Sequence, residues 1–274
     1  MRRVISLYRT SVGKKFYMAV TGAILIGFLV AHMVGNLKMY MGAQHFNEYA
    51  EFLREVGEPV LPRMVGLWIF RVILLFCVGL HMLSAWQVYL QSRKARGGKY
   101  TKEESLLFSY ASRTMRWGGV IIAAFVIYHI LHFTVGSVHP DFVAGDAYRN
   151  VILGFQSWWV TGFYTATLVM VTFHLYHGLW SAFQTVGANH PKYNPYRRPL
   201  ALVLALIIFV GFMIVAGTLS RPCAPAAISK ARPPAKIVAP AMPTRPPSCT
   251  SRASRLPIPK SAPAAPAVAK NPIT

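Results

Sequence analysis

Acidic residues are scarce in this chain of 274 residues, which has 8 Asp and Glu against 29 Lys and Arg. Only 14% of the residues are charged and 54% are hydrophobic, whereas a soluble domain carries about 25% charged residues. The three cysteines, Cys77, Cys223 and Cys249, are too few and too scattered for a disulfide framework or a zinc site. These shortages exclude an ordinary soluble domain and predict an integral membrane protein in contact with lipid.

The net charge of +21 would suit a protein that binds nucleic acid. However, the basic residues flank long hydrophobic runs or fall in a proline-rich tail, and they form no face interleaved with aromatic residues. We therefore expect no nucleic-acid partner.

Five apolar segments are long enough to cross a bilayer as helices, which takes about 20 residues each. They cover about residues 16–37, 64–90, 117–138, 158–186 and 200–219. The predicted fold is all-α, with a membrane anchor of five transmembrane helices over residues 1–220. Residues 39–62 are expected to hold a short amphipathic helix at the interface. The Pro/Ala-rich, basic segment 221–274 is expected to be a disordered tail.

The charges of the connecting segments predict the orientation in the membrane. Basic residues gather before the first span, between spans two and three, and before span five. Six of the eight acids lie in the other two loops. This distribution predicts a multi-pass membrane protein with a cytoplasmic N-terminus and an external C-terminus, although the basic tail runs against the rule.

Six of the nine histidines lie inside the predicted spans, where ionisable side chains are costly and usually functional. A single one could serve as a hydrogen-bonding residue between helices. That explanation is less suitable here, because each of the first four spans supplies at least one. The loop histidines, His45, His139 and His190, are expected to be solvated.

Depth sorts these histidines into two pairs. With a helical rise of about 1.5 Å per residue, His32 and His129 lie about 25 and 20 Å from the inner boundary, in the outer half of the membrane. His81 and His174 each lie about 25 Å from the outer boundary, in the inner half. Two stacked pairs in a four-helix core are what two bis-histidine b-type haems require. Zinc is the weaker interpretation, and the absence of a Cys-x-x-Cys-His sequence excludes covalent haem attachment.

Two features of this core stay open at this point. His132 and His177 each follow another histidine by three residues on the same helix face, so either member of each doublet could be the ligand. Four basic residues could pair with haem propionates, two for each haem. They are Arg71 and Lys38 for the outer haem, and Arg113 and Arg116 for the inner one. Snorkelling explains Arg71 equally simply, and ordinary orientation signalling explains Arg113 and Arg116.

The sequence resembles the cytochrome b anchor subunits of succinate dehydrogenase over about residues 1–220. The N-terminal motifs are Ser-Val-Gly-Lys-Lys at 11–15, Thr-Gly at 21–22 and His-Met-Val-Gly-Asn-Leu at 32–37. The fourth span adds Gly-Phe-Tyr at 162–164 and Phe-His-Leu-Tyr-His-Gly-Leu-Trp-Ser at 173–181.

The resemblance implies that His32 and His129 ligate an outer haem and that His81 and His174 ligate an inner one, which resolves both doublets. It further implies flavoprotein and iron–sulfur partner subunits on the cytoplasmic face and electron relay to a membrane quinone, menaquinone by likeness. The succinate chemistry would belong to those partners. Thr172 stands where some fumarate reductase members carry a glutamate, which favours a succinate oxidiser.

Two rival functions fit part of the pattern. One is the dihaem cytochrome b anchor of another respiratory dehydrogenase, of the formate dehydrogenase, hydrogenase or nitrate reductase type. The other is a transporter that uses intramembrane histidines for proton coupling.

Overall fold

The computed structural model describes residues 8, 10–95, 106–139, 141–187 and 190–219, and for residues 106–114 the backbone alone. Helices dominate this part of the chain, and it contains no strand, so the all-α prediction is confirmed. The predicted tail, residues 221–274, lies outside the described residues.

The helices follow one another with short connections. In chain order they are α2 (Ser11–Leu37), η1 (Lys38–Met41), α3 (Ala43–Glu55), α4 (Val65–Ala95), α5 (Leu106–Ile130), η2 (Leu131–Val135), α6 (Ala147–Gln156), α7 (Trp158–Thr185) and α8 (Asn194–Leu219). The segment η1 is a 3-10 turn and η2 is a π turn that continues α5.

Four segments of the described chain are long and apolar enough to cross a membrane. They are Ser11–Met41, Val65–Ala95, Met115–Val135 and Asn194–Leu219, so the chain has the helices of a multi-pass membrane protein. The helix α7 is not among them. It has 28 residues and no Asp, Glu, Lys or Arg, but its threonines, tyrosines and histidines lower its mean hydropathy. The predicted count of five spans is therefore not confirmed.

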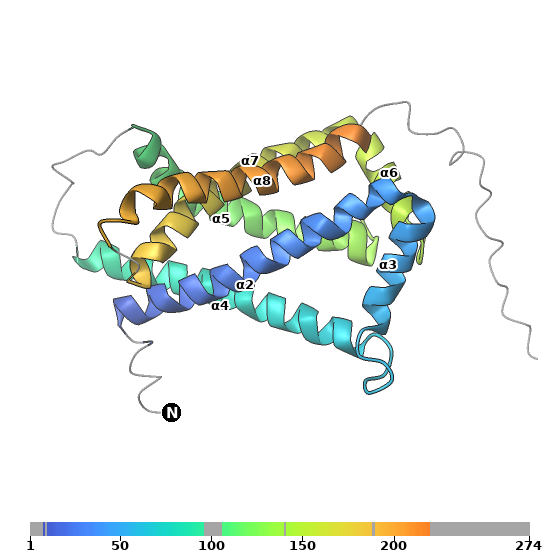
Figure 1. Ribbon diagram of the computed structural model, residues 1–274, viewed down its shortest axis with the longest axis horizontal. Coiled ribbons are helices and arrows are strands. Elements are labelled where there is room, and N and C mark those ends of the chain that lie inside the picture. Colours follow the sequence, from blue (N-terminus) through green and yellow to red (C-terminus); the bar gives the residue numbers. More distant parts are fainter. Residues whose placement is uncertain (1–7, 9, 96–105, 140, 188–189, 220–274) are drawn as a thin grey trace, which may run out of the picture. The chain divides into compact units, whose positions relative to one another are not determined.

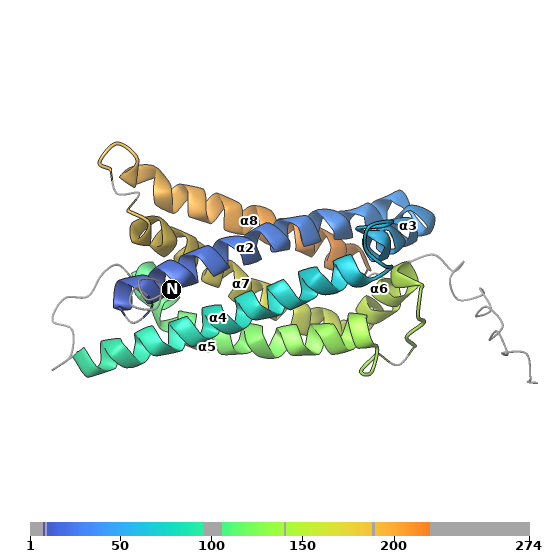
Figure 2. The same ribbon diagram turned by 90° about the horizontal axis from the view of Figure 1, so that it is seen from below.

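The long helices lie side by side in a bundle (Figure 1, Figure 2). The helix α2 packs along α4 and also contacts α7, while α5 packs along α7. At one end, the Arg116 guanidinium of α5 lies 4.8 Å from the ring centre of Tyr89 on α4. The sequence α2–α4–α5–α7 thus forms the four sides of a helical core, and α8 packs outside it against α2 and α7.

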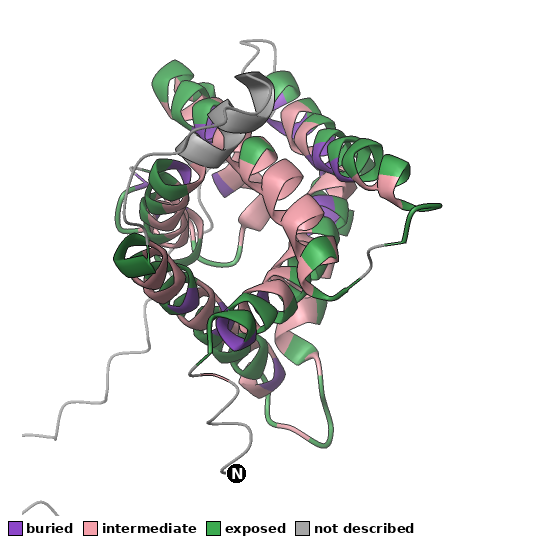
Figure 3. Ribbon diagram, turned by 90° about the vertical axis from the view of Figure 1, so that its left-hand side faces the viewer, coloured by how far each residue is buried: buried purple, intermediate pink, exposed green. Residues whose placement is uncertain are grey.

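Large apolar side chains cover the outside of these helices. On α4, Phe70, Val72 and Phe76 are 58–66% exposed. On α8, Ile207 and Val210 are about half exposed. In a view along the bundle, exposed residues (green) occur on helices all around it (Figure 3). A soluble monomer rarely leaves apolar patches of this extent in water, whereas lipid chains would cover them.

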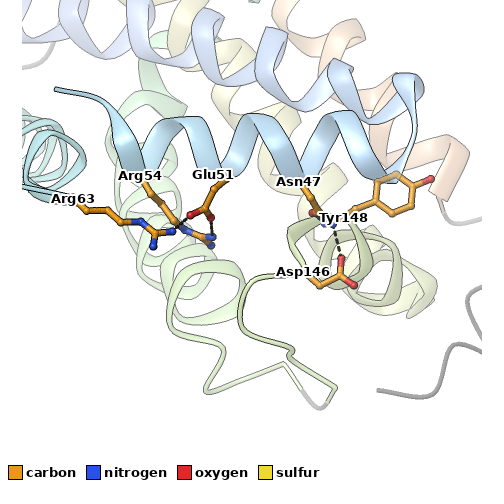
Figure 4. Close-up of polar contacts among 6 residues, drawn as sticks. All are labelled: Asn47, Glu51, Arg54, Arg63, Asp146 and Tyr148. Atoms are coloured by element: carbon orange, nitrogen blue, oxygen red, sulfur yellow. Dashed lines mark hydrogen bonds and ion pairs between the residues drawn. The ribbon is translucent and has the colours of Figure 1, made fainter. Parts of the chain in front are cut away.

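The short helices α3 and α6 lie at one end of the bundle, called here the cap end (Figure 1). The predicted amphipathic helix is confirmed as α3, and its buried Phe46 contributes to a cluster with Ile152 and Phe155 of α6. The side chain of Asn47 joins the two helices by donating to Asp146 Oδ1 at 3.0 Å and accepting from the Tyr148 backbone N–H at 2.9 Å (Figure 4).

The helix α6 was not among the sequence predictions. Asp146 begins it as an N-cap, accepting from the backbone N–H of Arg149 at 3.1 Å. A capping aspartate before a short amphipathic run was the available signal.

Candidate haem-binding core

The first histidine pair lies toward the cap end of the bundle. His32 comes from the last third of α2 and His129 from the last turn of α5. Their ring centres are 5.8 Å apart and their planes are nearly perpendicular, at 85°. The structure therefore brings together two side chains that are 97 positions apart in the sequence.

The second pair lies toward the opposite end. His81 of α4 and His174 of α7 have ring centres 6.1 Å apart, with an angle of 55° between the planes. His81 lies beside Thr21, which precedes His32 by eleven residues on α2, so the two pairs are about 16 Å apart along the bundle. Two separate levels were expected from the sequence, and the structure shows two.

Each pair spans a diagonal of the four-helix core. In the described chain, neither α2 with α5 nor α4 with α7 packs closely, and the same holds for α4 with α5, which meet at one end where Arg116 approaches Tyr89. The imidazoles nevertheless reach across both diagonals and approach one another. Helical bundles bind cofactors and metals in their core, between side chains that project from facing helices.

The spacing of each pair fits two axial ligands of one metal ion. A metal–imidazole bond is about 2.0–2.1 Å long and the ring centre lies about 1 Å beyond the bonded nitrogen, so two imidazoles on opposite sides of one ion have centres about 6 Å apart. Within the described residues, no three or more His, Cys, Asp or Glu side chains form a cluster suited to a metal ion. Two imidazoles without further protein ligands suit haem iron, whose other four ligands come from the porphyrin.

His81 is oriented by the backbone of α2. Its Nδ1 lies 3.1 Å from the Met18 carbonyl oxygen and 3.2 Å from Thr21 Oγ1. Because a carbonyl can only accept, Nδ1 carries the proton and Nε2 keeps the lone pair that a metal requires. On the other side of the pair, Nδ1 of His174 is buried and has no hydrogen-bond partner among the residues that the structure describes.

The doublet formed by His129 at the end of α5 and His132 in η2 separates into two environments. His129 faces His32, whereas His132 is 2% exposed and stacks on His139 at 4.9 Å between ring centres. The Tyr164 hydroxyl lies between the two members of the doublet, 3.3 Å from Nδ1 of His129 and 3.1 Å from Nδ1 of His132. On α7, His174 is the member that faces His81, and His177 lies beside Trp180 at 6.1 Å.

The motif that begins at His32 supports the cap-end pair. Asn36 donates from Nδ2 to the His32 carbonyl oxygen at 2.7 Å. A Cβ on Gly35 would lie 2.9 Å from the Tyr49 ring, so a glycine is needed for α3 to dock this closely on α2. This motif thus fixes the attachment of the cap next to the first pair.

The four candidate basic residues differ in their surroundings. The Arg71 guanidinium lies 5.0 Å from the ring centre of Trp68, and Lys38 Nζ lies 5.1 Å from that of Tyr49. Arg116 is exposed beside Tyr89, and the Arg113 side chain lies outside the described residues. Their role toward a propionate stays a prediction.

One prediction about the loop histidines is wrong. His139 was expected to be solvated, but it is 5% exposed. Its Nε2 donates to the Asn150 carbonyl oxygen at 2.9 Å, and its Nδ1 accepts from the Asp141 backbone N–H. Both nitrogens are satisfied, one by α6 and the other within the loop, which makes burial possible. His45 and His190 are exposed as expected.

The fold and this core define the chain as a helical, multi-pass membrane protein with two facing pairs of histidines in its interior. No protein-family profile matches the chain, and no solved structure matches it. Among curated proteins it is similar to the succinate dehydrogenase cytochrome b558 subunit of Bacillus subtilis (strain 168), with 28% identity over 208 residues. The similar region covers 74% of this chain and 94% of that relative. The resemblance to succinate dehydrogenase cytochrome b subunits is thereby confirmed.

Proposed function

We propose that this chain is the cytochrome b membrane-anchor subunit of a succinate dehydrogenase. In this proposal it binds two b haems and relays electrons between an iron–sulfur subunit and a membrane quinone, menaquinone by resemblance. The observation that carries the proposal is the pair of histidine contacts, 5.8 and 6.1 Å between ring centres, across the two diagonals of the core. The curated relative supports the membrane-anchor role.

His32 and His129 would hold the haem nearer the cap end, and His81 and His174 the other. Bound haem supplies one-electron chemistry at its iron. The chain orients the ligating rings, since the Met18 carbonyl fixes the tautomer of His81. Thr172 carries no carboxyl group that could transfer a proton. Its hydroxyl donates to the Leu168 carbonyl oxygen at 2.8 Å.

The wider arrangement is part of the same proposal. The helix α7 would be a fifth span, because it carries one ligand of the second pair and about 42 Å of helix exceeds the hydrocarbon thickness. The N-terminus would face the cytoplasm, where flavoprotein and iron–sulfur subunits would dock, and the cap end would face outward. Arg71 and Lys38 would neutralise propionates at the cap end, and Arg113 and Arg116 at the cytoplasmic end.

The test is a reduced-minus-oxidised absorption spectrum of the purified protein and of three variants. The wild type should show two b haems. His81→Ala should lose one of them, and His32→Ala should lose the other, because each removes one axial ligand from a different pair. His45→Ala changes an exposed histidine of α3, away from both pairs, and should keep both.

Two results would contradict the proposal. A folded wild-type protein without a haem spectrum would exclude a cytochrome and favour a transporter. A dihaem protein that co-purifies with formate dehydrogenase, hydrogenase or nitrate reductase subunits, without succinate dehydrogenase subunits, would assign the chain to another respiratory complex.

A further inference from the structure

Tyr164, the last residue of the Gly-Phe-Tyr motif at 162–164, occupies a central position beside the cap-end histidine pair. Its hydroxyl is within hydrogen-bond distance of two imidazoles, those of His129 in α5 and His132 in η2. Resting on the haem ligation proposed above, we propose that Tyr164 is a positioning residue that orients His129 as a ligand, fixes its tautomer and sets its electron-donating strength.

The tyrosine ring is held firmly in this position. It is 5% exposed and belongs to the buried cluster that joins α7 to the cap. The rings of Phe125 and Phe155 pack edge-on against it, with ring centres 4.8 and 5.0 Å away. Because these neighbours leave the ring little freedom, the hydroxyl stays between the two imidazoles.

Hydrogen accounting fixes the direction of both bonds. A tyrosine hydroxyl has one proton to donate and lone pairs with which to accept. Ligation through Nε2 leaves the proton of His129 on Nδ1, so that nitrogen donates to the Tyr164 oxygen. The hydroxyl then donates its own proton to Nδ1 of His132, which places the proton of His132 on Nε2.

The opposite assignment, with His132 as the ligand, does not agree with the geometry. His132 is enclosed by stacked rings, Tyr128 at 5.4 Å and His139 at 4.9 Å between centres. His129 is the member that lies 5.8 Å from His32. The structure therefore separates ligand from support within this doublet without reference to any relative.

The two pairs are supported by acceptors of different chemistry. The ligand His81 donates to a backbone carbonyl, that of Met18, which no substitution removes. The ligand His129 donates to a side-chain hydroxyl that is polarised by a second histidine. A donated Nδ1 hydrogen bond raises the basicity of a ligating imidazole, which favours ferric iron, so Tyr164 gives the chain separate control over one haem.

The test is a redox titration of the purified protein with both haems bound, comparing wild type with Tyr164→Phe. Loss of the acceptor should make His129 a weaker donor and raise the midpoint potential of the cap-end haem. The expected change in the electron-transfer equilibrium between the two haems is up to about tenfold, which is about 59 mV for one electron. The ferric electron paramagnetic resonance line of the same haem should move, since it depends on the orientation of the imidazole planes.

The matched control is Tyr128→Phe, which removes a hydroxyl from a neighbouring ring on the same side of the core. Among the described contacts, that hydroxyl makes no hydrogen bond to either histidine of the doublet. Both midpoint potentials should stay within error of the wild type. Equal shifts in the two variants would overturn the inference, as would a shift of the other haem alone.

A second variant covers the case in which Tyr164→Phe fails to assemble. His132→Phe removes the group that polarises the hydroxyl but keeps the hydroxyl itself, so the cap-end potential should rise above the wild-type value while that of the other haem stays unchanged. Where Tyr164→Phe also assembles, its shift should be the larger one, and the double variant should shift no further than Tyr164→Phe, because both act through one hydroxyl. Additive shifts, or a missing cap-end haem in His132→Phe, would contradict the positioning role. Absence of haem from the wild type would instead refute the proposed function.

Discussion

The contact between α3 and α6 allows a prediction about the stability of the cap. Asn47 is the residue to change, because its amide makes both polar contacts between the two helices (Figure 4). Asn47→Ala removes the donor to Asp146 and the acceptor for the Tyr148 N–H, but leaves Asp146 free to cap α6. The change therefore tests the attachment of α6 and not its formation.

The size of the effect follows from the two hydrogen bonds. One neutral bond contributes about 0.5–1.5 kcal/mol and one to a charged acceptor about 1.5–3 kcal/mol. Asn47 is half-buried, so water replaces part of the loss and the lower end of the sum, about 2 kcal/mol, is expected. This free energy corresponds to an increase of about 30-fold in the local opening of the cap.

Hydrogen exchange in lipid nanodiscs measures that opening. Peptides that cover α3 and α6 should exchange about 30-fold faster in Asn47→Ala, and peptides from α4 should be unchanged. The control is Gln44→Ala, which removes an exposed hydrogen bond of 2.8 Å to Glu48 within α3 and should change exchange by less than about threefold. An effect of Asn47→Ala no larger than that of the control would refute the reasoning.

Two further substitutions test the haem sites. A Cβ at Gly22 would already contact the His81 ring, 3.4 Å from Cε1, so Gly22→Leu should remove the haem of that pair from the difference spectrum. Gly27→Leu, on the same helix with nothing within 4 Å of the added Cβ, should keep both haems, and loss of haem in both variants would contradict a local steric effect. Arg71→Gln should lower the midpoint potential of the cap-end haem, because a nearby cation stabilises the reduced site. Arg63→Gln, which changes an exposed arginine paired with Glu51, should not, and equal shifts would show that Arg71 acts only through net charge.

The sequence predicted the long helices but not their ends. Apolar length is set by the bilayer, whereas a helix continues until a cap ends it. The first helix begins at Ser11 and not near 16, because the Thr10 side chain caps it by accepting from the Gly13 N–H at 2.9 Å. The second continues to Ala95, through residues whose charges excluded them from the predicted span.

Depth along each helix was also predictable, because rise per residue is constant. It was sufficient to group the histidines into the two pairs that the structure brings together, and their ligand role stays a prediction. The burial of His139 and the bridge at Tyr164 were not predictable in this way. The first depends on how an irregular loop folds back on α6, and the second on a contact between helices more than 30 residues apart, and local periodicity carries no information about either.

The π turn η2 has a practical consequence for comparing sequences. A π turn holds one residue more than an α-helical turn, and this one, Leu131–Val135, directly follows the helix that carries His129. A homologue with an uninterrupted α-helix here would be one residue shorter between His129 and Gly136. Its alignment would need a single gap at this position, and an ungapped alignment would match His132 with the wrong residue.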